Sequence, residues 1–168
     1  MTFPKILRPD ICVKSVYDIN YAELRSRGIT GLIFDIDGTL VPHGMPPESE
    51  TAALFEKLVR EGFSAVLLTD NDLKRAETFA LSVGVPYICD AEKPKRRGFI
   101  EAMRMLGTES DKTAVVGDRL LSDIYGANRC GIFSVFVEYR KNAGETGVGK
   151  RRMFEKMYIK LCRKIGVL

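Results

Sequence analysis

The sequence predicts an α/β protein, with a parallel β-sheet covered on both faces by helices in a three-layer α/β/α sandwich. Three observations lead to this prediction. Short, continuous apolar runs are typical of strands buried on both faces. Segments with helical spacing separate these runs, as in right-handed βαβ units. Polar residues directly follow several of the runs, at the strand ends where such sheets bind ligands.

Five apolar runs are the expected strands, at residues 31–36, 63–68, 86–89, 113–117 and 132–137. Between them, three helices are marked by apolar residues at helical spacing: Leu54, Leu58 and Val59 before Gly62; Leu73, Ala76, Ala80 and Val83 before Gly84; Ile100, Met103 and Leu106 before Gly107. Each glycine is expected to end its helix. Pro94 is expected in the first turn of the third helix, where a proline is tolerated.

The chain of 168 residues has the size of a single compact domain, so we expect one domain over residues 1–168. A hydrophobic fraction of 45% and a charged fraction of 29% argue against both disorder and a membrane-embedded protein. The N-terminus lacks the apolar core of a secretory signal, and no run approaches the roughly 20 apolar residues of a spanning helix. The four cysteines have no metal-type spacing. We therefore expect a cytoplasmic protein with reduced cysteines.

Basic residues are concentrated after residue 140, although the whole chain carries a net charge of only +4. Residues 150–168 are expected to form a basic amphipathic helix with one apolar side: Phe154, Met157, Tyr158, Leu161 and Ile165. Such a helix suits peripheral contact with an anionic membrane, and it equally suits packing of the apolar side on the protein's own core. No nucleic-acid partner is expected.

Two carboxylates stand at the end of the first expected strand, in the run Asp35-Ile-Asp37-Gly38-Thr39. Two negative charges in one turn are costly unless a cation or a proton compensates them. Gly38 gives the turn backbone freedom, and the N–H groups of such a turn can hold phosphate oxygens. The run therefore predicts a positive ion nearby, although a lone Asp-x-Asp is also common in ordinary turns and helix caps.

Three further strand ends carry matching side chains, namely Thr69, Lys93, and Asp118 with Asp123. A hydroxyl, an ammonium and more carboxylates should thus meet at one edge of the sheet. Oxygen ligands suit Mg²⁺, and a lysine neutralises phosphate charge, so the sequence predicts a site for a hard cation and a phosphoryl group. Each of these residues alone has an ordinary explanation as a cap, a turn acid or a solvated lysine; their combination in this order does not.

In this order and at these strand ends, the four segments resemble the motifs of the haloacid dehalogenase-like (HAD) phosphatases, over about residues 29–137. The resemblance implies a HAD-like Rossmannoid sheet in which Asp35 is the nucleophile that forms an aspartyl phosphate. Asp37 would be the general acid and base. Mg²⁺ would bind the Asp35 carboxylate, the Asp37 backbone carbonyl and Asp118. Asp123 would lie in the outer shell of the metal site, without binding the ion directly.

The other residues of the implied site surround the phosphate. Thr69 and Lys93 would hold phosphoryl oxygens, and Gly38 and Thr39 belong to the loop around them. Asp70 stands where many relatives carry asparagine. An extra acid beside a dianionic substrate lowers its affinity unless the acid points away. We therefore expect Asp70 to contact the residues that bind phosphate and not the phosphate itself. The only histidine, His43, is expected to be a solvated loop residue, with a substrate contact as the alternative.

The flanking segments extend the resemblance to nearly the whole chain. Leu7-Arg-Pro-Asp-Ile-Cys-Val-Lys and Glu23-Leu-Arg-Ser-Arg-Gly-Ile, with the motifs Glu92-Lys-Pro and Gly117-Asp-Arg-Leu-Leu-Ser-Asp, resemble the YqeG-type family of HAD class IIIA. That family is related to the phosphatidylglycerophosphate phosphatases. It usually has Asp-x-Asp-Asn-Thr where this chain has Gly38 instead of asparagine.

The spacing of the motifs leaves no room for a cap domain. Leu40 to Thr69 holds a loop and one helix, and Thr69 to Lys93 holds one helix and one strand. An open site accepts bulky or surface-bound phosphates, and oligomerisation is one way to supply a lid. The leading hypothesis is a Mg²⁺-dependent phosphatase of phosphatidylglycerophosphate at the inner membrane face. A soluble sugar phosphate or nucleotide is the alternative substrate, and a non-catalytic phosphoacceptor module is the second alternative, against which Asp37 argues.

Overall fold

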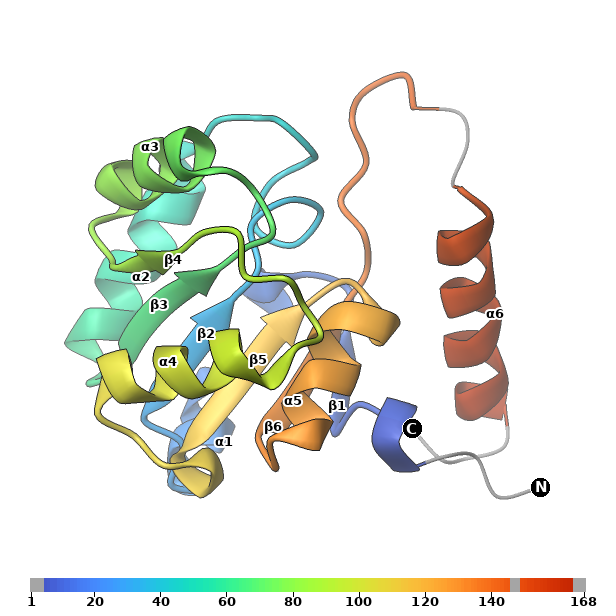
Figure 1. Cartoon of the computed structure of the whole chain (residues 1–168), viewed down its shortest axis with the longest axis horizontal. Coiled ribbons are helices and arrows are strands. Elements are labelled where there is room, and N and C mark those ends of the chain that lie inside the picture. The colour runs from blue at the N-terminus through green and yellow to red at the C-terminus, as the bar shows by residue number, and fades with distance from the viewer. Residues whose placement is uncertain (1–4, 146–148, 165–168) are drawn as a thin grey trace.

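In the computed structural model, which describes residues 5–145 and 149–164, the chain folds around a parallel sheet of six strands in the order β1-β6-β5-β2-β3-β4. The strands are β1 (Ile11–Val13), β2 (Gly31–Phe34), β3 (Ser64–Leu68), β4 (Tyr87–Ile88), β5 (Thr113–Gly117) and β6 (Phe133–Val137). The predicted α/β fold is confirmed (Figure 1).

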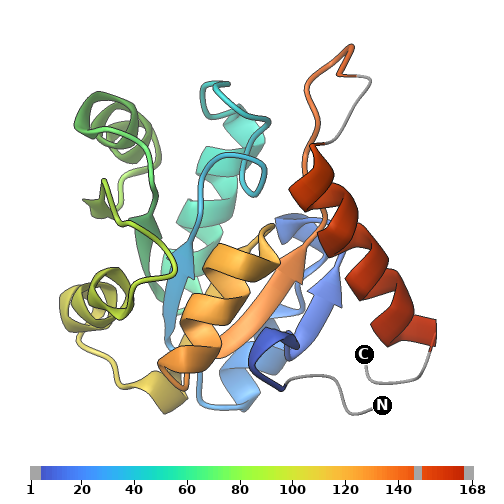
Figure 2. The ribbon, with the colours of Figure 1, turned by 45° about the vertical axis from the view of Figure 1, so that its right-hand side comes forward.

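Helices cover both faces of the sheet (Figures 1 and 2). The first face is covered by α1 (Tyr21–Ser26), α2 (Ser49–Arg60) and α3 (Leu73–Val83), and the second by α4 (Arg96–Leu106) and α5 (Tyr125–Arg129). The alternation of side chains along β2 serves both layers. Phe34 packs with the first set of helices, whereas its neighbour Ile33 packs with the second.

The glycine signals for helix ends are confirmed in two places. Gly84 and Gly107 follow α3 and α4 with φ angles of 71° and 67°, the left-handed conformation that glycine adopts without strain. The prediction for Pro94 is wrong, because α4 begins only at Arg96. Some residues assigned to apolar faces also lie outside: Val59, Leu73 and Ile100 are exposed.

The connections between the strands are short on the side that carries the predicted site. Between β2 and β3 the chain forms only a loop and α2, and between β3 and Lys93 it forms only α3 and β4. No cap domain is inserted at either place, as the motif spacing predicts. Neither connection therefore places a cap domain over the carboxyl edge of the sheet.

The last helix, α6 (Lys150–Lys164), stands at the outer edge of the molecule, beside β6 and β1 (Figures 1 and 2). It packs through Tyr158 and Ile159 against Phe136 of β6 and against Leu120 and Ile124 of the turn after β5. Four large apolar side chains of α6 remain exposed: Met153, Phe154, Met157 and Leu161.

The expected apolar side of this helix is thus only partly right. Tyr158 faces the core, whereas Phe154, Met157 and Leu161 face outward; Ile165 lies outside the described residues. The helix packs on the protein, but by a different face from the one that the sequence pattern singles out. Among the described residues, no helix is both long enough and apolar enough to cross a membrane.

Candidate active site

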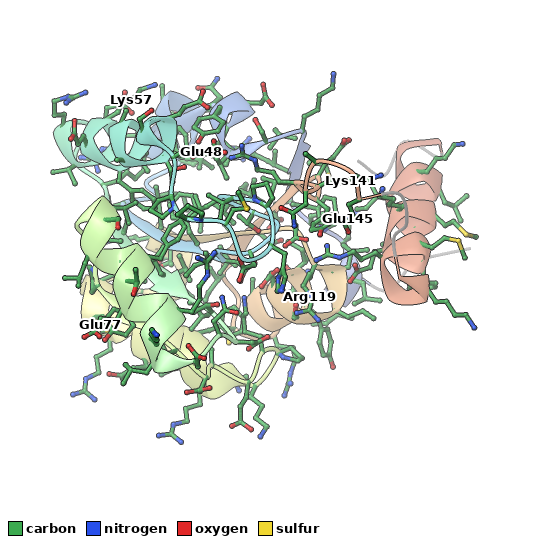
Figure 3. The ribbon with its side chains drawn as sticks, turned by 90° about the horizontal axis from the view of Figure 1, so that it is seen from above. Glu48, Lys57, Glu77, Arg119, Lys141 and Glu145 are labelled. Atoms are coloured by element: carbon green, nitrogen blue, oxygen red, sulfur yellow. The ribbon has the colours of Figure 1, made fainter. Side chains whose placement is uncertain are left out.

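The carboxyl edge of the sheet gathers the acidic residues that the sequence analysis singles out. Asp35 directly follows β2 and Asp118 directly follows β5, and these two strands are paired neighbours. Asp123 lies on the helical turn Leu120–Ile124 that comes next. Asp35, Asp118 and Asp123 each offer a carboxylate oxygen within 4.8 Å of the others, and all three side chains are buried. Figure 3 looks down on this edge of the molecule, with Arg119, the neighbour of Asp118, labelled.

Two cations lie against this cluster of three carboxylates. The Nζ of Lys93 is 2.6 Å from Oδ1 of Asp35 and 2.7 Å from Oδ1 of Asp123. Its side chain is only 2% exposed. On the other side, Arg152 of α6 donates a hydrogen bond to Oδ2 of Asp118. The cluster therefore binds positive charge from two segments far apart in the sequence.

Burial and nearby charges shift the pKa values of Asp118, Asp35 and Lys93. Burial raises the pKa of Asp118 to about 7, and the charges of Asp35 and Asp123 add to this effect while Arg152 opposes it. Burial likewise raises the pKa of Asp35 against the attraction of Lys93. For Lys93, burial lowers the pKa, but the charges of Asp123 and Asp35 outweigh burial and raise it above its ordinary value. The lysine is thus held as an ammonium ion.

Small residues make room for the acids. A Cβ atom on Gly117 would lie 2.4 Å from Cβ of Asp123, so the close approach of that acid requires glycine. Gly38 has a φ of 89°, and a Cβ there would lie 2.6 Å from the ring of Tyr139 and 2.8 Å from Oδ2 of Asp118. Position 38, where the resembled family usually has asparagine, is glycine in this chain, and the ring of Tyr139 packs directly on the turn there.

Asp37 lies apart from the cluster of three acids, two residues after Asp35. Its carboxylate accepts hydrogen bonds from the backbone N–H of Gly44 at 2.9 Å, from Nδ2 of Asn71 at 2.6 Å and from Nη2 of Arg75 at 2.8 Å. Burial raises the pKa of Asp37, but the hydrogen bonds from Arg75, Gly44 and Asn71 outweigh burial, so its pKa lies below the ordinary value. His43 is exposed, with Nδ1 3.9 Å from Oδ2 of Asp37.

The hydroxyl groups expected around the phosphate lie in two places. The Oγ1 of Thr39 donates to Oδ1 of Asp118 at 3.1 Å, so Thr39 joins the loop after β2 to the end of β5. Thr69 is buried at the end of β3, where its Oγ1 accepts the backbone N–H of Asn71 at 3.1 Å. Asp70 accepts the backbone N–H of Lys93 at 2.8 Å and thereby holds the loop that carries the lysine.

Sequence reasoning missed three residues of this region: Asn71, Arg75 and Arg152. A signal existed for the first two, because Asn71 comes two residues after Thr69 and Arg75 lies in the first turn of the helix that follows, so both start at the same edge of the sheet. For Arg152 no local signal exists. It comes from α6, and only the packing of that helix brings it to Asp118.

The donor set fits a magnesium ion. The three converging ligand atoms are all carboxylate oxygens, the type that Mg²⁺ prefers, and no sulfur or imidazole takes part. Three buried carboxylates also need compensating positive charge, which Lys93 and Arg152 supply only in part. A divalent cation at this place would meet both conditions.

Comparisons with known proteins agree with this geometry. Residues 91–152 match the family model described as HAD-hydrolase-like. The chain is 31% identical over 134 residues to the probable phosphatase YqeG of Bacillus subtilis (strain 168), an alignment that covers 79% of this chain and 78% of that protein. It is 29% identical over 170 residues to the chloroplastic phosphatidylglycerophosphate phosphatase 1 of Chlamydomonas reinhardtii, covering 95% of this chain and 63% of the algal protein.

A comparison with solved structures gives the same fold. An uncharacterized protein from Listeria monocytogenes serotype 4b superimposes with a TM-score of 0.56 at 18% identity, covering 81% of this chain and 99% of that one. With the parallel sheet, the acid cluster beyond its carboxyl edge and the relative from B. subtilis, the assignment is plain: this chain belongs to the HAD phosphatases and, among them, to the YqeG type.

Proposed function

We propose that this phosphatase hydrolyses phosphomonoesters with Mg²⁺, through an aspartyl phosphate on Asp35, and that its substrate is phosphatidylglycerophosphate. The observation that carries the chemical part is the arrangement of Asp35. Its carboxylate is buried beside Asp118 and Asp123 and lies 2.6 Å from the Lys93 ammonium. A nucleophile, an oxygen-ligand cation site and a fixed positive charge are thus supplied at one point.

The first half-reaction forms the intermediate. A carboxylate oxygen of Asp35 attacks phosphorus, and the bond between phosphorus and the ester oxygen breaks. Asp37 gives its proton to the departing oxygen, so the first product leaves as a neutral alcohol. Lys93 and Thr69, with the loop at Gly38 and Thr39, hold the phosphoryl oxygens during this transfer.

The second half-reaction releases phosphate. A water molecule attacks phosphorus while the Asp37 carboxylate takes its proton, and the bond to Asp35 breaks, which restores both acids. Asp35, the Asp37 backbone carbonyl and Asp118 would hold Mg²⁺, with Asp123 behind them. When bound, the ion supplies positive charge to the phosphoryl oxygens.

Substitution of the nucleophile tests this chemistry. We expect Asp35→Asn to reduce the hydrolysis of an aryl phosphate by at least about a thousandfold, because the amide cannot form the phosphorylated intermediate. Asp111→Asn, which changes an exposed aspartate before β5, serves as the control and should retain activity. Hydrolysis by Asp35→Asn at the rate of the parent, or hydrolysis by the parent that does not require Mg²⁺, would refute the mechanism.

The exposed surface of α6 supports the lipid substrate. The exposed fractions of Met153, Phe154, Met157 and Leu161 are 54%, 51%, 63% and 44%. Exposed lysines of the same helix flank these side chains, so the surface combines apolar groups with positive charge. An anionic lipid bilayer is complementary to both. In this proposal residues 1–168 form one hydrolase domain, which acts in the cytoplasm at the inner membrane face.

A substrate panel separates the lipid from soluble phosphates. It compares phosphatidylglycerophosphate in anionic vesicles with an aryl phosphate, a sugar phosphate and a nucleotide. The lipid is expected to have the highest kcat/KM. If the soluble compounds are hydrolysed far better and no vesicle binding is found, the substrate is soluble and the lipid proposal fails.

A further inference from the structure

A cavity of about 450 Å³ lies between the end of β6 and α6, next to the acid cluster. Asp118 forms part of its wall, so the cavity adjoins the place where the phosphoryl group would be transferred. Phe136 and Ile159 supply apolar surface, and Tyr139 stands beside the turn at Gly38. Whatever part of a substrate extends from the phosphoryl group toward α6 enters this cavity.

The cavity is rich in cations. Its walls include four basic side chains, Lys141, Arg152, Lys156 and Lys160. Arg152 marks its border with the acid cluster, since its guanidinium bonds to Asp118 and lies 3.6 Å over the ring of Tyr139. Figure 3 shows Lys141 between the sheet and α6.

The cavity wall also carries acidic side chains, namely Glu155 and Glu138 beside Asp118. Glu155 is buried, and its Oε1 accepts the backbone N–H of Leu121 at 3.3 Å. Glu138 is exposed at the end of β6. Within the described residues, Lys156 and Lys160 form no ion pair. Their charge is therefore available to a ligand.

We propose that this cavity is a subsite for a second anionic group of the substrate, a phosphodiester joined through a short linker to the phosphate that is removed. The lysines would bind the diester oxygens by charge-assisted hydrogen bonds, and the apolar surface would contact the adjoining carbon atoms. This inference rests on the proposed phosphatase function and adds to it the basis of substrate choice.

A larger cavity, of about 860 Å³, does not serve this purpose. It is lined by residues that precede the strands, such as Ile29 before β2 and Ile132 before β6. It therefore lies at the amino edge of the sheet, opposite the acid cluster. The smaller cavity is the one that can hold part of a substrate whose phosphate reaches Asp35.

The test uses two soluble phosphomonoesters, glycerol 3-phosphate and glycerophosphoglycerol phosphate, the deacylated headgroup that carries the additional phosphodiester. For the parent enzyme, kcat/KM is expected to be at least about tenfold higher for the second compound. Glycerophosphoglycerol, which has the diester but no monoester, should inhibit competitively. The dihexanoyl lipid, run alongside, distinguishes recognition of the headgroup from recognition of acyl chains.

The double variant Lys156→Gln/Lys160→Gln removes charge from the cavity without touching Asp118. We expect its KM for glycerophosphoglycerol phosphate to rise about tenfold with little change in kcat, and inhibition by glycerophosphoglycerol to weaken in parallel. The variant with arginine at both positions should keep the preference. Lys57→Gln, on α2 at the far side of the molecule from α6 (Figure 3), is the matched control and should change neither substrate.

The outcomes separate the two levels of the proposal. Equal kcat/KM for the two compounds in the parent, or a preference that survives in the double glutamine variant, would overturn the subsite while hydrolysis of aryl phosphate upholds the phosphatase mechanism. Absence of Mg²⁺-dependent hydrolysis of any phosphate would overturn the proposed function, and the subsite with it.

Discussion

Arg75, in the first turn of α3, donates a hydrogen bond of 2.8 Å from Nη2 to Oδ1 of Asp37. The guanidinium also donates to the backbone carbonyl of Met45 at 2.6 Å, so it is fixed between the helix and the loop after β2. This contact stabilises the ionised form of the residue that must carry a proton in the first half-reaction. Arg75 therefore tunes the proposed general acid.

Replacement of this arginine should shift a pH profile. In Arg75→Gln the pKa of Asp37 rises, because a hydrogen bond and a positive charge that lower it are lost. Asp37 then keeps its proton to higher pH, and the alkaline limb of kcat/KM for an alkyl phosphate moves to higher pH. The profile for an aryl phosphate with a good leaving group should move less, since that group departs without a proton. Lys74→Gln on the same helix is the control; equal shifts for both substrates would count against the role of Asp37.

Removal of the buried lysine should make stability depend on Mg²⁺. Lys93→Met leaves the carboxylates of Asp35 and Asp123 without their common partner. Breaking a buried ion pair costs several kcal/mol, so the free energy of unfolding in EDTA should fall by about 3 kcal/mol. Saturating Mg²⁺ restores positive charge and should return part of this loss in urea denaturation.

An exposed lysine on the same loop provides the control for that experiment. Lys95 pairs with Glu92 at 2.7 Å, but its side chain is 66% exposed. Because exposed ion pairs contribute little, Lys95→Met should change the free energy of unfolding by less than about 1 kcal/mol, with or without Mg²⁺. A loss in Lys93→Met that Mg²⁺ leaves untouched would show that the lysine acts through packing alone.

Binding of Mg²⁺ should weaken in acid. Burial, with the charges of Asp35 and Asp123, raises the pKa of Asp118 to about 7. Below that pH the carboxyl holds a proton that the ion must displace, so Kd should increase up to about tenfold for each pH unit, and it should level off above. Calorimetry in buffers of different ionisation enthalpy should find about one proton released near pH 6 and almost none near pH 8. A Kd that is constant across this range would contradict the assignment of Asp118.

The outward face of α6 should control membrane binding. Phe154→Ser/Met157→Ser removes two exposed apolar side chains, so vesicle binding should fall at least about tenfold, while thermal stability stays unchanged because neither is in the core. Leu81→Ser, which changes an apolar side chain of α3 that is 78% exposed, is the matched control. Co-sedimentation with anionic vesicles measures the effect. If the double variant binds as well as the parent, α6 is not the membrane contact.

Much of the fold could be predicted because its signals are local. Gly84 and Gly107 end helices for a reason that lies within one turn of chain. The apolar runs at β2, β3, β5 and β6 are buried almost throughout, so composition alone marks them. The strand β1 escaped prediction, since its three residues are only half-buried and depend on pairing with β6, more than a hundred residues later.

The candidate site likewise has a part that the sequence predicts and a part that depends on the tertiary structure. Because parallel strands present their carboxyl ends at a common edge, the order of segments along the chain suffices to bring Asp35, Asp118 and Lys93 to one place. The partner that each acid then binds comes from a segment far away in the sequence, so only the tertiary structure determines it. The bonds from Arg75 to Asp37 and from Arg152 to Asp118 join residues 38 and 34 positions apart, and no periodicity encodes them.

By itself, the sequence determined the parallel α/β fold, the absence of a cap domain and the acids that stand beyond the strands, because these follow from short-range propensities and from the geometry of every parallel sheet. Only the tertiary structure decided how α6 is turned about its axis. A helical wheel allows several faces to pack, and the contact of Tyr158 and Ile159 with Phe136 selects one of them. That choice places Arg152 on Asp118, opens the cavity beside the acid cluster and leaves Met153, Phe154, Met157 and Leu161 exposed.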